Sequence, residues 1–172
     1  MIIESARLRL VPLTLSYVIA PPDDRATLAR EVGAEVPAAW PPELWDQDAQ
    51  DWCRRLLEHD PSTAWIPRCI VLRRRTVVAG VFGCGPPDVD GRVLIGYGVL
   101  PEFRRRGYAG EALGAFAVWA LRDARVRVII GDTYPHLTAS IRTMERNGFR
   151  YAGPGEEEGT IRYELTRPTA NG

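Results

Sequence analysis

One short stretch of the chain combines residue types that suit the binding of a phosphate. A run of three arginines is followed at once by small residues that open a helix predicted over 107–124. The first turn of a helix carries backbone N–H groups without intrahelical partners, and the peptide dipoles add positive potential there. Small side chains let an anion reach those groups, and arginines add charge-assisted hydrogen bonds. The residues of this predicted diphosphate site are Arg104, Arg105, Arg106, Gly107, Tyr108, Ala109 and Gly110.

The same residues allow a second interpretation, a solvated basic helix start in which the glycines only turn the chain. The pattern favours binding over this alternative. All 22 basic residues of the chain are arginine, so any side-chain cation that holds a phosphate must be arginine, whose planar fork suits phosphate oxygens. The absence of lysine also excludes the phosphate-binding loop that requires Gly-Lys.

Hydrophobic periodicity indicates the elements that position this stretch. The strand predicted at 93–100 ends directly before it and is strongly apolar, which is typical of a strand in the middle of a sheet. This arrangement of elements predicts a mixed α/β or α+β domain on one sheet, spanning 1–172 with a core of about 6–167. The other predicted strands cover 6–12, 69–72, 77–82, 126–130, 149–152 and 160–166, and further helices cover 24–32 and 138–147.

Two details of the helices are also predicted. A longer helix should open at Trp40-Pro41-Pro42, because proline is tolerated in a first helical turn. Thr138 is the expected N-cap of the last helix, which should end before Gly148. A stripe of apolar residues at helical spacing in the longer helix is expected in the core rather than in a ligand site. The stripe consists of Trp45, Ala49, Trp52 and Leu56.

Charge and composition argue against several classes of function. The formal net charge is zero, which disfavours bulk electrostatic binding to nucleic acid or to an anionic membrane. The 3 cysteines lack C-x-x-C spacing, so we expect buried reduced thiols, with neither a disulfide framework nor a metal site. Arg7 and Arg9 interrupt the first residues, which therefore do not resemble a secretion signal, and no apolar stretch is long enough to cross a membrane. We expect a cytoplasmic protein.

The arginine-glycine stretch resembles the signature of a known family. Arg104-x-x-Gly107-x-Ala109 matches the Arg/Gln-x-x-Gly-x-Gly/Ala signature of the GCN5-related N-acetyltransferases (GNAT). The preceding Ile-Gly-Tyr strand and the following Glu-Ala-Leu helix also look like that family. Residues 138–149 and 7–13 are similar to the subgroup that acetylates ribosomal-protein N-termini at alanine or serine. Together these segments cover most of the chain in the expected order.

The resemblance implies a fold, a co-substrate and a reaction. The fold would be a single mixed, mostly antiparallel sheet of about six to seven strands flanked by helices. The reaction would move an acetyl group from acetyl-coenzyme A (acetyl-CoA) to a primary amine, on a protein N-terminus or a small molecule, by direct attack in a ternary complex. No metal is implied. In the family, the signature loop holds the coenzyme A diphosphate. The strand before that loop binds the pantetheine arm, which would place Val99 and Leu100 beside it, with an N–H near Val99 polarising the acetyl carbonyl.

The resemblance also suggests residues for the proton transfers. Ser140 matches a position whose hydroxyl protonates the leaving thiolate in related enzymes; the alternative is an ordinary residue of a first helical turn. Tyr134 is a second candidate for this donor. Tyr97, on the strand that binds the cofactor, would either shape the acceptor pocket or simply pack.

Two positions depart from the family pattern. Leu94 stands where many relatives have Glu, and Leu137 stands where many have Asn. Asp132 or a chain of water molecules would then have to take the proton of the amine. The departures motivate an alternative function, a non-catalytic acyl-CoA-binding sensor on the same fold. A nucleic-acid-binding module that uses residues 73–75 and 104–106 is a third hypothesis, which zero net charge disfavours.

The acceptor side is less defined by the sequence. The helices around 24–52 would build the acceptor site, and exposed strands at the sheet edges would permit a homodimer. Several acidic residues of this segment would either attract a cationic amine or form a solvated face. These residues are Glu31, Glu35, Glu43, Asp46 and Asp48.

Overall fold

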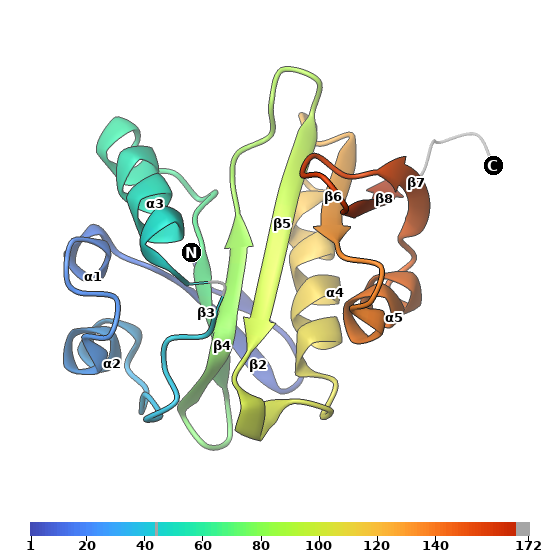
Figure 1. Cartoon of the computed structure of the whole chain (residues 1–172). Helices are drawn as coiled ribbons and strands as arrows, with labels where there is room; N and C mark the ends of the chain where they lie inside the picture. The colour runs from blue at the N-terminus through green and yellow to red at the C-terminus, as the bar shows by residue number, and fades with distance from the viewer. Residues whose placement is uncertain (44, 168–172) are drawn as a thin grey trace.

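A computed structural model describes residues 1–43 and 45–167, and one sheet of eight strands organises this part of the chain. The strands are β1 (Ile3–Glu4), β2 (Leu8–Pro12), β3 (Arg68–Leu72), β4 (Val77–Cys84), β5 (Arg92–Val99), β6 (Val128–Thr133), β7 (Arg150–Pro154) and β8 (Ile161–Thr166). Their order in the sheet is β1-β2-β3-β4-β5-β6-β8-β7 (Figure 1). Only β5 and β6 pair in parallel. The predicted mixed, mostly antiparallel sheet is confirmed. It has eight strands rather than six to seven because the short β1 pairs with β2.

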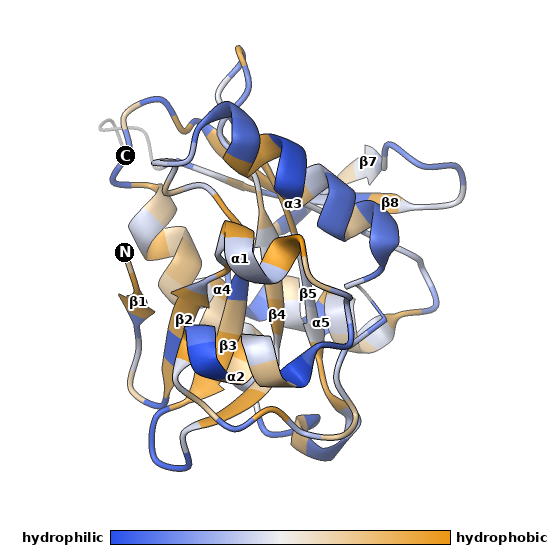
Figure 2. Ribbon diagram, turned by 90° about the vertical axis from the view of Figure 1, so that its left-hand side faces the viewer, coloured by the Kyte–Doolittle hydropathy of each residue, from blue (hydrophilic) through white to orange (hydrophobic). Residues whose placement is uncertain are grey.

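Helices cover both faces of this sheet (Figures 1 and 2). The first three, α1 (Leu15–Val18), α2 (Arg25–Val32) and α3 (Gln47–His59), lie on one face. The other face carries α4 (Tyr108–Ala120) and α5 (Thr138–Arg146). Phe116 of α4 packs against Phe82 of β4, with ring centroids 4.7 Å apart. Figure 2 shows the strands as mainly hydrophobic behind α2 and α3, which are largely hydrophilic toward the viewer.

Helix α3 begins later than the sequence predicts. Its first residue is Gln47, directly after Asp46, whose carboxylate accepts a hydrogen bond from the Ala49 N–H and caps the helix. The predicted start at Trp40 is wrong, because a residue before proline is disfavoured in the helical conformation. Leu44, which the predicted helix would contain, lies outside the described residues.

The predicted apolar stripe is partly wrong for the same reason. Trp45 is buried, but it precedes the helix, so helical spacing counted from it does not apply. The helix buries Gln50, Cys53 and Leu57 instead, and the side chain of Trp52 is 40% exposed. Trp52 is therefore available at the surface rather than fixed in the core.

The caps of the other two predicted helices differ in their outcome. Asp24 accepts from the Thr27 N–H at the start of α2, and Gly33 ends this helix with φ 63°, as the sequence predicts. Thr138 is the first helical residue of α5 rather than its N-cap. That position belongs to Leu137, which makes no side-chain capping bond.

The three cysteines are free and buried, as predicted. Burial raises the pKa of Cys53 and of Cys84 to about 12, so both remain thiols at neutral pH. In the residues that the structure describes, no helix is long and apolar enough to cross a membrane. Nor do three His, Cys, Asp or Glu side chains gather there as a metal site would require.

Candidate functional site

Strands β5 and β6 pair over only the first part of their length. The parallel ladder joins Arg92–Ile95 to Val128–Gly131 and ends there. Beyond it, β5 continues as far as Val99 with β4 as its partner, and β6 continues as far as Thr133 with β8 as its partner. The two strands therefore separate toward their carboxyl ends (Figure 1). The edge of β5 that faces this separation keeps backbone groups available to a ligand.

The backbone of Val99 faces this open edge. The Leu100 N–H donates to the Ala79 carbonyl of β4 at 2.8 Å, and successive residues of a strand direct their backbone groups to opposite sides. The N–H and C=O of Val99 therefore point away from β4. In agreement, the Val99 carbonyl accepts a hydrogen bond from Arg104 Nε at 2.9 Å. Of the two residues predicted beside a pantetheine arm, Val99 has its N–H on the open side, and Leu100 has its N–H bound to β4.

Gly80 of β4 allows an unusually close approach of β4 to this part of β5. A Cβ atom at position 80 would overlap Gly98 O and would lie 2.9 Å from Val99 Cα. The register between β3 and β4 shifts just before this point, between Ile70 and Val71, as in a β-bulge. The sequence predictions do not include Gly80, although an isolated glycine in an apolar strand indicates a bulge or a close approach.

The turn after β5 exposes the first turn of α4 to solvent. A short 3-10 helix, η1 (Pro101–Phe103), buries Phe103 and anchors the turn. Arg105 and Gly107 then adopt positive φ angles of 61° and 78°. Gly107 is the N-cap of α4 and offers no side chain, so the N–H groups of the first turn receive no side-chain capping bond. Positive potential and unpartnered donors at this point fit a diphosphate.

The two arginine runs of the sequence lie close together at this end of the sheet. Arg73, Arg74 and Arg75 belong to the turn between β3 and β4, and Arg75 lies over the ring of Phe103 with its guanidinium carbon 5.7 Å from the centroid. The exposed Arg104, Arg105 and Arg106 follow Phe103 directly. Their combined charge makes this end of the sheet attractive to an anionic ligand.

The predicted proton donor Ser140 is in contact with Tyr97. The Tyr97 hydroxyl lies 3.3 Å from Ser140 Oγ, where either oxygen can donate, and it also donates to the Ser140 carbonyl at 3.3 Å. Burial raises the pKa of Tyr97, although its hydrogen bond with Ser140 acts in the opposite direction. Tyr97 therefore stays protonated at neutral pH, and the two hydroxyls form a pair between β5 and α5.

The two other candidates, Tyr134 and Asp132, have different surroundings. Tyr134 is exposed and stacks on His136, with ring centroids 5.6 Å apart. Both carboxylate oxygens of Asp132 accept from the Arg162 guanidinium, at 2.9 and 2.8 Å, and one also accepts from the Glu156 N–H. The hydrogen bonds from Arg162 lower the pKa of Asp132 and outweigh the effect of its burial. This carboxylate is therefore a weak proton acceptor.

The opposite face of β5 is only partly covered. Because Tyr97 points toward α5, Leu94 and Gly96 lie on the other face of the strand. Leu94 is 50% exposed. The indole of Trp52 lies over Gly85, directly after β4, where it comes within 2.9 Å of the place that a Cβ atom would take. An exposed aliphatic side chain, an exposed indole and bare glycine backbone thus border the open part of β5.

Of the acidic residues predicted for an acceptor site, two have structural partners. Glu31 accepts a hydrogen bond from the Thr14 hydroxyl at 3.0 Å, and Asp46 caps α3. Glu35 forms an isolated backbone bridge with Val77.

The sequence profile of the acetyltransferase (GNAT) domain matches residues 7–150. The chain belongs to the GNAT acetyltransferase family. A curated relative, the uncharacterized N-acetyltransferase YjdG of Bacillus subtilis (strain 168), is 27% identical over 150 residues, which are 86% of this chain and 89% of that protein. The resemblance predicted from the signature is confirmed, and the protein is an acyltransferase of this family.

Solved structures agree with the GNAT fold of this acetyltransferase. The ribosomal-protein-S5-alanine acetyltransferase of Vibrio fischeri superposes with a TM-score of 0.68 at 13% identity, over 96% of both chains. RimL, a ribosomal L7/L12 alpha-N-protein acetyltransferase solved in complex with coenzyme A, gives a TM-score of 0.66 at 19% identity. That comparison covers 96% of this chain and 98% of RimL. At these identities the likeness is one of fold.

Proposed function

We propose that this acetyltransferase transfers an acetyl group from acetyl-CoA to a primary amine by direct attack in a ternary complex. The observation that supports this most strongly is the open carboxyl-terminal edge of β5, which leads directly into the basic first turn of α4. An extended thioester with a diphosphate at one end suits such a path. Strand-edge groups can bond the amides of its arm, and a helix start can bond its phosphates.

Each end of the path has residues suited to one part of acetyl-CoA. The N–H groups from Arg104 to Gly110 and the exposed arginines would hold the diphosphate. The open edge of β5 would bond the pantetheine arm. The Val99 N–H would then donate to the acetyl carbonyl and stabilise the negative charge that develops on its oxygen.

The chemistry requires few further groups. A primary amine is mostly protonated at pH 7, so it must first lose a proton to water. Its nitrogen then attacks the thioester carbonyl carbon. As the tetrahedral intermediate collapses, the C–S bond breaks, the new C–N bond remains and the nitrogen releases its second proton. The thiolate takes a proton from the Ser140 hydroxyl, which the Tyr97 hydroxyl orients.

Asp132 has a structural part in this proposal rather than the part of a base. Its ion pair with Arg162 joins β6 to β8, and its lowered pKa opposes the uptake of a proton. Water on the open face of β5 therefore receives the protons of the amine. Tyr134, which is exposed and stacked on His136, forms part of the surface around that opening.

The acceptor would enter over the partly open face of β5, past Leu94 and Trp52. Both side chains are apolar and exposed there, so an amine with an apolar neighbouring group would bury their surface. RimL and the Vibrio fischeri enzyme are named for the modification of ribosomal-protein N-termini. We therefore propose a peptide N-terminus with an apolar first residue as the acceptor, in preference to a polyamine.

An acceptor screen tests this function. The protein is incubated with acetyl-CoA, peptides of varied N-terminal residue and polyamines, and the acceptors are examined by mass spectrometry for a single acetyl increment. Acetylation of peptides with apolar N-terminal residues is expected, and Trp52→Ala should raise their KM. Preference for polyamines would refute the acceptor class. Binding of acetyl-CoA without any transfer would favour the alternative of a non-catalytic sensor, which the apolar Leu94 and Leu137 motivate.

A further inference from the structure

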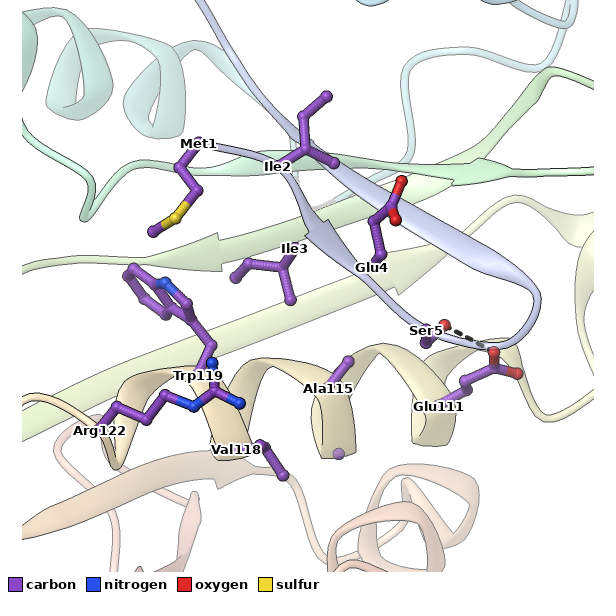
Figure 3. A pocket seen from close by; sticks show the side chains of 11 residues that line it. Met1, Ile2, Ile3, Glu4, Ser5, Glu111, Ala115, Val118, Trp119 and Arg122 are labelled. Atoms are coloured by element: carbon purple, nitrogen blue, oxygen red, sulfur yellow. Dashed lines mark hydrogen bonds between the residues drawn. The ribbon is translucent and has the colours of Figure 1, made fainter.

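The N-terminal segment of the chain is fastened to the helix that begins at the predicted diphosphate site. Glu111, in the first turn of α4, accepts hydrogen bonds from three groups of the segment before β2. They are the Ser5 hydroxyl at 2.6 Å, the Arg7 backbone N–H at 2.7 Å and Arg7 Nε at 2.6 Å. Figure 3 shows the Ser5 bond, beside a hollow of about 510 Å³ between β1 and α4. Arg7 and Glu111 are 104 residues apart in the sequence, so neither belongs to the family signature.

Arg7 also contacts the turn itself. Its Nη1 donates to the Arg106 carbonyl at 3.1 Å, and its guanidinium carbon lies 4.8 Å from the centroid of the Tyr108 ring. Its Nη2 is 3.5 Å from the place that a Cβ atom of Gly107 would take. One side chain thus touches three successive residues of the turn and the first helical turn behind it.

The segment that carries Arg7 is itself fixed to the sheet. The Arg73 N–H donates to the Arg7 carbonyl at 2.9 Å, and Arg73 Nη1 donates to the Ser5 carbonyl at 2.8 Å. Burial alone would raise the pKa of Glu111, but the hydrogen bonds from Ser5 and Arg7 prevail and hold it below its usual value. The carboxylate is therefore ionised at neutral pH, and the contact between the two segments is a charged one.

We infer that Arg7 and Glu111 are positioning residues for coenzyme A, because together they fix the turn at 105–108 in the conformation that presents its N–H groups to the diphosphate. Arg105 and Gly107 in this turn have positive φ angles, which only surrounding contacts can hold in place for a residue such as arginine. The Arg7 contacts bracket both residues, at the Arg106 carbonyl and at Tyr108. A turn fixed before the ligand arrives loses less entropy on binding.

Calorimetric titration with coenzyme A tests this inference, which rests on the proposed function only in assuming that coenzyme A binds at this turn. Arg7→Ala and Glu111→Gln should each raise the Kd for coenzyme A by roughly fivefold to tenfold. The double variant should raise it little further, because both changes break one contact. Arg7→Lys should restore part of the affinity. Arg9→Ala is the matched control. It removes an arginine of β2 whose side chain makes no hydrogen bond or ion pair with the described residues, so its Kd should equal that of the wild type.

The design separates a positioning part from a merely structural one. Titrations are made far below the Tm of each variant, where all of them are folded, so a loss of stability alone would leave the Kd unchanged. Amide exchange at 105–110 should also be faster in Arg7→Ala than in the wild type. An unchanged Kd in both single variants, or additive losses in the double variant, would overturn the inference. If the wild type itself bound no coenzyme A, the proposed function would fail instead.

Discussion

The close approach of β4 to β5 makes Gly80→Ala the most direct test of how the open edge of β5 is positioned. The new methyl group would overlap Gly98 O and would lie 2.9 Å from Val99 Cα, where ordinary contact begins at 3.4 Å. Both neighbours are backbone atoms, so no rotation of a side chain can relieve the overlap. The Gly98–Val99 peptide must therefore move by at least about 0.5 Å.

This displacement should affect catalysis more than folding. Overpacking of this kind costs about 1–3 kcal/mol of stability, which a folded domain can tolerate. The Val99 N–H, however, would leave the place from which it stabilises the oxyanion. A misplacement of about 1 Å can reduce a rate roughly 100-fold, so we expect kcat to fall by about 10-fold to 100-fold.

The assay compares kcat for the acceptor found in the screen and the free energy of unfolding in urea. Gly83→Ala is the matched control on the same strand, because a Cβ there would meet nothing closer than Gly96 O at 3.5 Å. Its kcat should stay within about threefold of the wild type. Equal rates for the two variants would refute the reasoning, and so would a fall in the rate of Gly80→Ala that matches its fraction of unfolded protein.

Three other predictions concern single residues. Gly107→Val forces a β-branched residue to φ 78°, so it should cost about 1–3 kcal/mol in urea unfolding and weaken coenzyme A binding in calorimetry; an unchanged Kd would contradict the assigned diphosphate site. Ser140→Ala should lower kcat by about tenfold or more with little change in KM, and a normal kcat would remove Ser140 from the mechanism. Asp132→Asn should lose the stability from the pair with Arg162. Because the pKa of Asp132 is lowered in the folded state, that stability is present above about pH 4 and disappears as the pH falls further. Urea unfolding at pH 7 and pH 3 should therefore separate the variant from the wild type only at pH 7.

Local patterns are the reason that much of the fold could be predicted. The central strand, the basic turn and α4 follow each other without interruption, and each has its own signal in the apolar periodicity, the glycine positions or the arginine run. Asp24 and Gly33 likewise mark the ends of α2 through their own side chains and backbone. Such signals depend on neighbours in the sequence, which a single chain displays in full.

The contacts that complete the candidate site are of another kind. Arg7 and Glu111 form their ion pair because β1 and β2 return to the start of α4, and nothing in the sequence near either residue indicates the other. The contact between Tyr97 and Ser140 depends in the same way on how α5 packs against β5. The late start of α3 shows the limit within local patterns, since two competing signals, prolines after Trp40 and the Asp46 cap, stand close together.

The burial of Cys53, Cys69 and Cys84 has a practical consequence for enzymology on this protein. Buried thiols with strongly raised pKa values react slowly with electrophilic disulfides, because the thiolate is the reactive form. A chromogenic reagent for sulfhydryl groups can therefore follow the coenzyme released at each turnover continuously, with little background from the enzyme. The same property should spare the protein from mixed disulfides when old coenzyme stocks have oxidised.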